Sequence, residues 1–234
     1  ICKMNFFVIP QVSGIRLVVF FVLKLFVGFF VFWVYTHHYS GSDFFTYFSD
    51  STALVKNTFG GHVSYSAAWN GNFENTLFNS SRVIIVLNAV LQLFSGGNFY
   101  VHAVFFCFFS FIGLVALLKA FLQHFPNRRI SLVLALFFIP SILFWGSAAL
   151  KESVIIGIVG LLVCLTDFGL RRKYTFFQSV SVFMLLALLL FVKIYVLCAL
   201  LPLLFVNAVV TRTSVKYLFL KYLAGILFLG ILAF

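Results

Sequence analysis

The sequence predicts an all-α integral membrane protein with about seven transmembrane helices and one interfacial amphipathic helix. Hydrophobic residues make up 63% of the chain and charged residues only 9%, whereas soluble domains carry about 25% charged residues. Apolar runs recur along the whole chain, and the basic residues lie in the short gaps between them. The net charge of +11 therefore indicates membrane topology and lipid head-group contacts, and no nucleic-acid partner is expected.

Each expected span is an apolar run bounded by polar residues, and a helix needs about 20 residues to cross the hydrocarbon core. The run 177–210 is too long for one crossing and suffices for two short ones, with Lys193 at the turn. The expected spans are 15–35, 98–122, 130–147 (interrupted by Pro140), 153–168, 177–192, 194–210 and 217–234.

The polar stretch 36–97 is expected to be an extracytoplasmic loop with interfacial helices. Its segment 82–95 is apolar but too short to cross. Arg82, Asn88 and Gln92 recur in it near helical spacing and give it one polar edge. This pattern predicts an amphipathic helix that lies at the membrane surface.

The chain reads as a single membrane domain, 1–234, and because Phe234 still lies in an apolar run we expect the natural protein to continue. The positive-inside rule places the N-terminus and the basic gaps 123–129, 169–175 and 211–216 in the cytoplasm. The expected location is the bacterial inner membrane, with a multi-pass topology.

Two acids in the first loop are candidate catalytic residues. Asp43 and Asp50 are seven residues apart, which is two helical turns, so they can share one face. A carboxylate there can act as general base on a sugar hydroxyl. It can also hold a divalent metal beside a phosphate, although no metal site or other cofactor is expected from motif spacing. The alternative is a helix-capping Asp43 and a solvated Asp50.

Several cations on the same side are candidate contacts for a phosphate. Lys151 and Glu152 follow a span that Pro140 interrupts, and Lys193 lies in a tight turn close to Tyr195. Lys151 and Lys193 can neutralise a lipid-linked phosphate, with Glu152 orienting Lys151. Helix termination at Lys151 and snorkelling of Lys193 are the alternatives.

Two further polar residues belong to the predicted substrate-binding set. Arg82 starts the interfacial helix, and as for Lys193 the two interpretations are a phosphate contact and snorkelling to the head groups. His102 lies four residues into a span, where a satisfied buried polar group is more common than a ligand.

Three phrases occur in order along the chain: SRVIIVLNAVLQLFSGGNFYVH, IPSILFWGSAALKES and FVKIYVLCALLPLL. Over about 37–205 the chain resembles bacterial multi-span proteins of Bacteroidetes-type genomes, which are similar to the GT-C class of membrane glycosyltransferases. The first loop lacks the paired-acid DxD or ExD motif of that class.

The resemblance implies a seven-span module that takes sugar from a polyprenyl-phosphate donor on the outer face. Asp43 or Asp50 would then be the base, and Lys151, Lys193 and Arg82 would face the donor phosphate. Polysaccharide biosynthesis in the cell envelope would be the setting.

Two other functions stay open. A compact chain without a soluble domain also fits a non-catalytic membrane subunit that binds protein partners in a larger envelope complex. A lipid-linked glycan transporter would need charged residues at mid-membrane, where only Lys24 is expected.

Overall fold

The computed structural model describes residues 5–9, 12–39, 43–59 and 80–212, together with 217, 219–221, 223–224 and 227. Most of the expected last span, 217–234, and the polar segment 60–79 lie outside the described residues.

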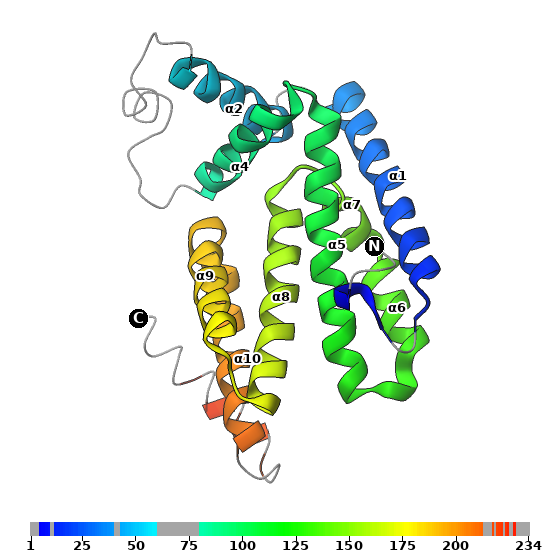
Figure 1. Cartoon of the computed structure of the whole chain (residues 1–234), viewed down its shortest axis with the longest axis vertical. Coiled ribbons are helices and arrows are strands. Elements are labelled where there is room, and N and C mark those ends of the chain that lie inside the picture. Colours follow the sequence, from blue (N-terminus) through cyan, green and yellow to red (C-terminus); the bar gives the residue numbers. More distant parts are fainter. Residues whose placement is uncertain are drawn as a thin grey trace.

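The described residues are helical and form no strand, which confirms the predicted all-α class. Two short 3-10 turns cover Asn5–Phe7 and Pro126–Arg128. The α-helices (Figure 1) are α1 (Gly14–His38), α2 (Asp43–Phe59), α4 (Ser80–Ser95), α5 (Phe99–His124), α6 (Arg129–Phe137), α7 (Pro140–Trp145), α8 (Lys151–Arg172), α9 (Phe176–Val192) and α10 (Ile194–Arg212).

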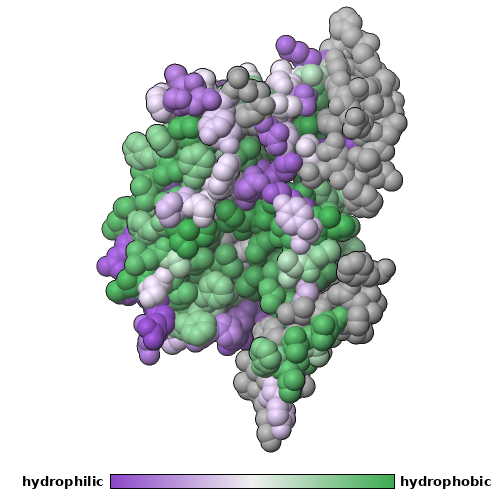
Figure 2. Space-filling view, turned by 180° about the vertical axis from the view of Figure 1, so that it is seen from behind, coloured by the Kyte–Doolittle hydropathy of each residue, from purple (hydrophilic) through white to green (hydrophobic). Residues whose placement is uncertain are grey.

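The three helices α1, α5 and α8 are long and apolar enough to cross a membrane. The helices α4, α9 and α10 are apolar but shorter. Large apolar side chains such as Phe26, Phe105 and Phe183 are exposed, as expected for side chains that face lipid. Figure 2 shows hydrophobic side chains over the middle of one face, with most hydrophilic ones toward its two ends. These features support a helical membrane protein, while the count of seven spans stays a prediction.

The long helices run between two ends of the molecule. At the upper end of Figure 1, α1 ends at His38, and α2 and α4 cross above the start of α8 at Lys151. At the lower end, α5 ends at His124 and α8 ends at Arg172. The hairpin of α9 and α10 packs beside α8, with its turn at Lys193.

The most extensive helix pair is α5 with α8, and glycines let their backbones touch. A Cβ at Gly160 would collide with the backbone carbonyl of Gly113, and a Cβ at Gly113 would collide with the carbonyl of Ile156. Small residues at a crossing allow this close approach in membrane helices. The pair thus forms a fixed frame that carries polar groups at both of its ends.

The expected span 130–147 is interrupted where the sequence predicted. The helix α6 ends at Phe137, and Pro140 begins α7 because proline fits the first helical turn. After α7, the segment Gly146–Leu150 has no helical structure, yet all of its residues are buried. Non-helical backbone at membrane depth is tolerated where protein covers it.

The polar edge of α4 faces the protein, while the exposed side chains of this helix are mainly apolar. Asn88 is 1% exposed and Gln92 8%, whereas Phe94 is 79% exposed. Gln92 Nε2 donates to Thr52 Oγ1 of α2 at 2.8 Å. The segment 82–95 is therefore helical as predicted, but its polar side chains bind α2 and α5 because buried amides need hydrogen-bond partners.

Candidate functional site

The first turn of α2 brings a carboxylate and a phenol together. Asp43 begins α2, and Tyr47, one turn later, donates a hydrogen bond from its hydroxyl to Asp43 Oδ2 at 2.9 Å. The Tyr47 side chain is buried, whereas Asp43 is exposed. Lys151 Nζ lies 5.3 Å from the centre of the Tyr47 ring, within cation–π range. The phenol therefore joins an acid from α2 to a cation at the start of α8.

A second acid–cation pair lies beside the first. Lys193 Nζ donates to Glu152 Oε1 at 2.8 Å, and the same Nζ is 5.5 Å from the centre of the Tyr195 ring. Both partners of the ion pair are partly exposed, at 21% for Lys193 and 34% for Glu152. The sequence predicted that Glu152 would orient Lys151, but the structure gives Glu152 a hydrogen bond with Lys193.

These residues form one group, which we call the upper cluster: Asp43, Tyr47, Lys151, Glu152, Lys193 and Tyr195. Burial raises the pKa of the Tyr47 phenol, a hydrogen bond with Ser81 opposes this, and Asp43 and Glu152 add to it. Burial alone would lower the pKa of Lys193, but its contacts with Glu152 and Tyr195 raise it overall. At neutral pH the cluster therefore holds a neutral phenol that donates and a Lys193 that is charged.

An apolar groove lies between α4, α5, α8 and α9 and encloses about 280 Å³. We call it the apolar groove; its lining residues are Leu87, Val90, Leu91, Phe105, Phe106, Phe109, Val154 and Leu188. Val154 follows Lys151 by one turn of α8, and Leu188 precedes Lys193 by little more than one turn. The groove walls therefore continue toward the charged residues of the upper cluster.

Two further predicted site residues, Asp50 and Arg82, lie on α2 and α4. Asp50 is partly buried two turns further along α2, and this burial raises the pKa of its carboxyl. Arg82 lies partly buried in the first turn of α4. The hydrogen bond from Tyr47 makes Asp43 the loop acid of the upper cluster.

His102 is fully buried in a network of neutral polar groups. Its Nδ1 lies 2.8 Å from Asn88 Oδ1, and its Nε2 lies 2.8 Å from Ser95 Oγ. Because the Asn88 oxygen can only accept, Nδ1 carries the proton and Nε2 accepts from Ser95. Both ring nitrogens are thus satisfied within the protein, which supports a structural role for His102.

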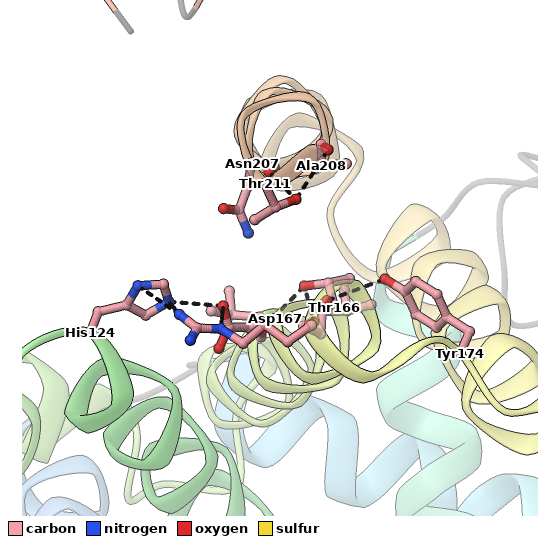
Figure 3. A network of polar contacts seen from close by, with 10 residues as sticks. His124, Thr166, Asp167, Tyr174, Asn207, Ala208 and Thr211 are labelled. Atoms are coloured by element: carbon pink, nitrogen blue, oxygen red, sulfur yellow. Dashed lines mark hydrogen bonds and ion pairs between the residues drawn. The ribbon is translucent and has the colours of Figure 1, made fainter. Parts of the chain in front are cut away.

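A separate polar network closes the lower end of α5 and α8 (Figure 3). Asp167 Oδ1 lies 2.8 Å from His124 Nε2 and 3.3 Å from Arg171 Nε. Asp167 Oδ2 is buried and has no hydrogen-bond partner among the described residues. The Tyr174 hydroxyl donates to the backbone carbonyl of Thr166 at 3.3 Å. The network joins α5 to α8 and fixes their lower ends.

Within the described part of the chain, no group of three or more His, Cys, Asp or Glu residues is arranged to hold a metal ion. No protein-family model, curated protein or solved structure matches this chain.

Tyr47 is the member of the upper cluster that the sequence analysis missed. Its spacing of four residues from Asp43 was the available signal, because side chains four apart on a helix are neighbours.

Proposed function

We propose that this protein is a GT-C-like membrane glycosyltransferase that moves a sugar from a polyprenyl-phosphate donor to an acceptor on the extracytoplasmic side. The observation that carries the proposal is an apolar groove whose walls on α8 and α9 lead, about one helical turn further, to Lys151 and Lys193 of the upper cluster. The likeness of the sequence phrases to GT-C proteins, with their seven-span module, supports the same conclusion.

The chemistry assigned to the cluster uses its acids and cations in different roles. Asp43 is the general base that takes the proton from the acceptor hydroxyl as the hydroxyl oxygen attacks the anomeric carbon. The bond between that carbon and the phosphate oxygen breaks, and the phosphate leaves with the electron pair. Lys151, with Lys193 and Arg82, neutralises the leaving phosphate. Tyr47 holds the Asp43 carboxylate in position through its hydrogen bond.

The apolar groove supports a substrate with a hydrocarbon chain. Its lining is entirely aliphatic and aromatic. An isoprenoid chain in the groove would place the attached phosphate near the residues one turn away, Lys151 and Lys193. The substrate class is therefore an amphiphile with an anionic head.

The positive-inside rule assigns the upper end to the extracytoplasmic side. Among the described residues, the lower end holds Arg128, Arg129, Arg171, Arg172 and Lys173, and the upper end holds fewer basic residues, Lys56, Arg82, Lys151 and Lys193. This asymmetry supports a cytoplasmic N-terminus.

The test is donor turnover by the purified protein in nanodiscs. The assay measures release of radiolabelled sugar from a polyprenyl-phosphate sugar, with water as the default acceptor. Asp43→Asn keeps an oxygen that accepts from Tyr47 but removes the base, so turnover should fall by about 10²–10⁴-fold. Asp50→Asn is the matched control in the same helix and should retain most of the turnover.

Two results would count against this assignment. Equal turnover in both variants would remove α2 from the mechanism. Loss of turnover in Asp50→Asn alone would identify Asp50, and not Asp43, as the base. If the wild-type protein shows neither turnover nor donor binding, the non-catalytic subunit of an envelope complex becomes the better proposal, because the Glu152–Lys193 pair is complete without a ligand.

The lipid-linked glycan transporter is favoured by one specific observation, the interrupted span next to a charged residue. Lys24 is buried in the middle of α1, beside the non-helical segment after α7. Transporters often carry their sites at such breaks. Flipping of a fluorescent polyprenyl-phosphate analogue in proteoliposomes, without sugar release, would support this function.

A further inference from the structure

Lys24 is the most deeply buried charged side chain of α1, with 1% exposure halfway along a helix long enough to cross the membrane. Its Nζ donates hydrogen bonds to the backbone carbonyl of Gly146 and to Ser147 Oγ, the latter at 3.2 Å. No ion pair within the described ranges includes Lys24. A charge at this depth is costly and usually serves a function.

The two acceptors show what the charge stabilises. Gly146 is the C-cap of α7, and the C-terminal end of a helix carries a partial negative charge from its unpaired carbonyls. Gly28 lies one turn after Lys24 on α1, and the backbone at Ser147 packs closely against it. A Cβ at Gly28 would lie 2.6 Å from the Ser147 carbonyl oxygen, so only glycine leaves room for this contact. Lys24 and Gly28 therefore form one docking surface on α1 for the residues that follow α7.

The docked segment leads directly into the upper cluster. Gly146–Leu150 is buried and non-helical, and Lys151 and Glu152 are the first residues of α8 after it. Ser153 Oγ donates back to the carbonyl oxygens of Ala148 and Trp145. The segment is thus held by Lys24 from α1 and by Ser153 from α8, and the position of its backbone sets the position of Lys151 and Glu152.

We propose that Lys24 is a positioning residue for the upper cluster, which places Lys151 and Glu152 by fixing the end of α7 and the segment Gly146–Leu150. The functional part of this inference rests on the proposed donor site. The positioning itself does not, and the two can be tested separately.

The test compares Lys24→Met and Lys24→Arg with the wild-type protein in nanodiscs. Lys24→Met keeps the length and apolar character of the side chain but removes the donors. Hydrogen exchange of the backbone amides, followed by mass spectrometry, reports on 146–152 and, as an internal control, on 165–172 at the lower end of α8. Lys119→Met is the matched control variant, because Lys119 lies in the lower half of α5.

In Lys24→Met we expect exchange in 146–152 to be at least roughly tenfold faster, with 165–172 unchanged. Binding of the probe farnesyl phosphate should weaken by roughly 10- to 100-fold, as a displaced binding group does. The melting temperature should stay near the wild-type value, because relief of the desolvation cost of the buried charge offsets the loss of the two hydrogen bonds. Lys24→Arg should restore part of the protection and binding, and Lys119→Met should change neither.

Unchanged exchange in 146–152 would overturn the proposal. Faster exchange in both segments with a lower melting temperature would also overturn it, because it would show a general structural role. If no protein, including the wild type, binds farnesyl phosphate while the exchange pattern is as expected, the positioning role stands and the proposed donor site fails.

Discussion

Alanine at Gly160 should destabilise the protein more than alanine at Gly157, although both positions lie in α8. A Cβ at Gly160 would lie 2.6 Å from the Cα of Gly113 on α5, whereas carbon atoms in contact prefer about 3.5–4.0 Å. The obstacle is backbone, so α5 and α8 must separate by about 1 Å. A Cβ at Gly157 would meet the ring of Phe109, a partly buried side chain that can rotate away.

The magnitude follows from the difference between the two variants. In both variants alanine has a higher helix propensity than glycine, by about 1 kcal/mol, and this contribution cancels in the comparison. Overpacking against an immobile backbone costs about 1–3 kcal/mol, so Gly160→Ala should be less stable than Gly157→Ala by about that amount. Separation of the helices would also displace both polar ends of α8.

The assay is reversible unfolding in mixed micelles with increasing sodium dodecyl sulfate, which measures the free energy of unfolding for each variant. A difference of 1.4 kcal/mol corresponds to a tenfold change in the equilibrium constant. Equal stability of the two variants, or greater stability of Gly160→Ala, would refute the close contact between the backbones of α5 and α8.

Two further predictions concern the ion pairs. Lys193→Met should lower the free energy of unfolding by about 0.2–1 kcal/mol at pH 7, because the pair with Glu152 is partly exposed. The folded-state pKa of Lys193 is raised, so this contribution is complete below the unfolded pKa of about 10.4 and is lost as pH rises through the folded value. In denaturation experiments, the difference between the two proteins should therefore be smaller at pH 11 than at pH 7. Asp167→Ala should lower the free energy of unfolding by about 1.5–3 kcal/mol, because it removes the charge-assisted hydrogen bonds with His124 and Arg171. Amide exchange should become faster only at the lower ends of α5 and α8. An unchanged unfolding curve would show that His124 and Arg171 do not depend on Asp167.

Much of the helical organisation could be predicted from the sequence because lipid imposes simple requirements on length and polarity. The expected helices 15–35 and 98–122 match α1 and α5 within a few residues, and Pro140 marks the break before α7. The turn at Lys193 also lies where the length of 177–210 required it. These features depend on hydropathy and on proline geometry, both of which are local properties.

The orientation of the polar side chains could not be predicted in the same way. The polar edge of α4 suggested contact with water, but Asn88 and Gln92 find partners on α5 and α2 that only the tertiary structure brings close. The partner of Glu152 is Lys193, which lies 41 residues away. The glycines of α5 and α8 gave only a weak pairing signal, because Gly157 and Gly160 are three residues apart and their partner Gly113 lies in another helix.

The two polar ends of α8 differ in a way that bears on which of them can react. At the lower end, Asp167 is buried and already binds two donors from the protein, so its carboxylate connects helices. At the upper end, Asp43 is exposed and, among the described residues, accepts one hydrogen bond, from Tyr47. A carboxylate has room for several donors, so in the proposed mechanism Asp43 can accept from an incoming hydroxyl while Tyr47 fixes its orientation. Asp167 Oδ2 also lacks a partner among the described residues, but it is buried. The exposure of Asp43 therefore favours the upper cluster as the reactive end of the proposed enzyme, with the lower network as its support.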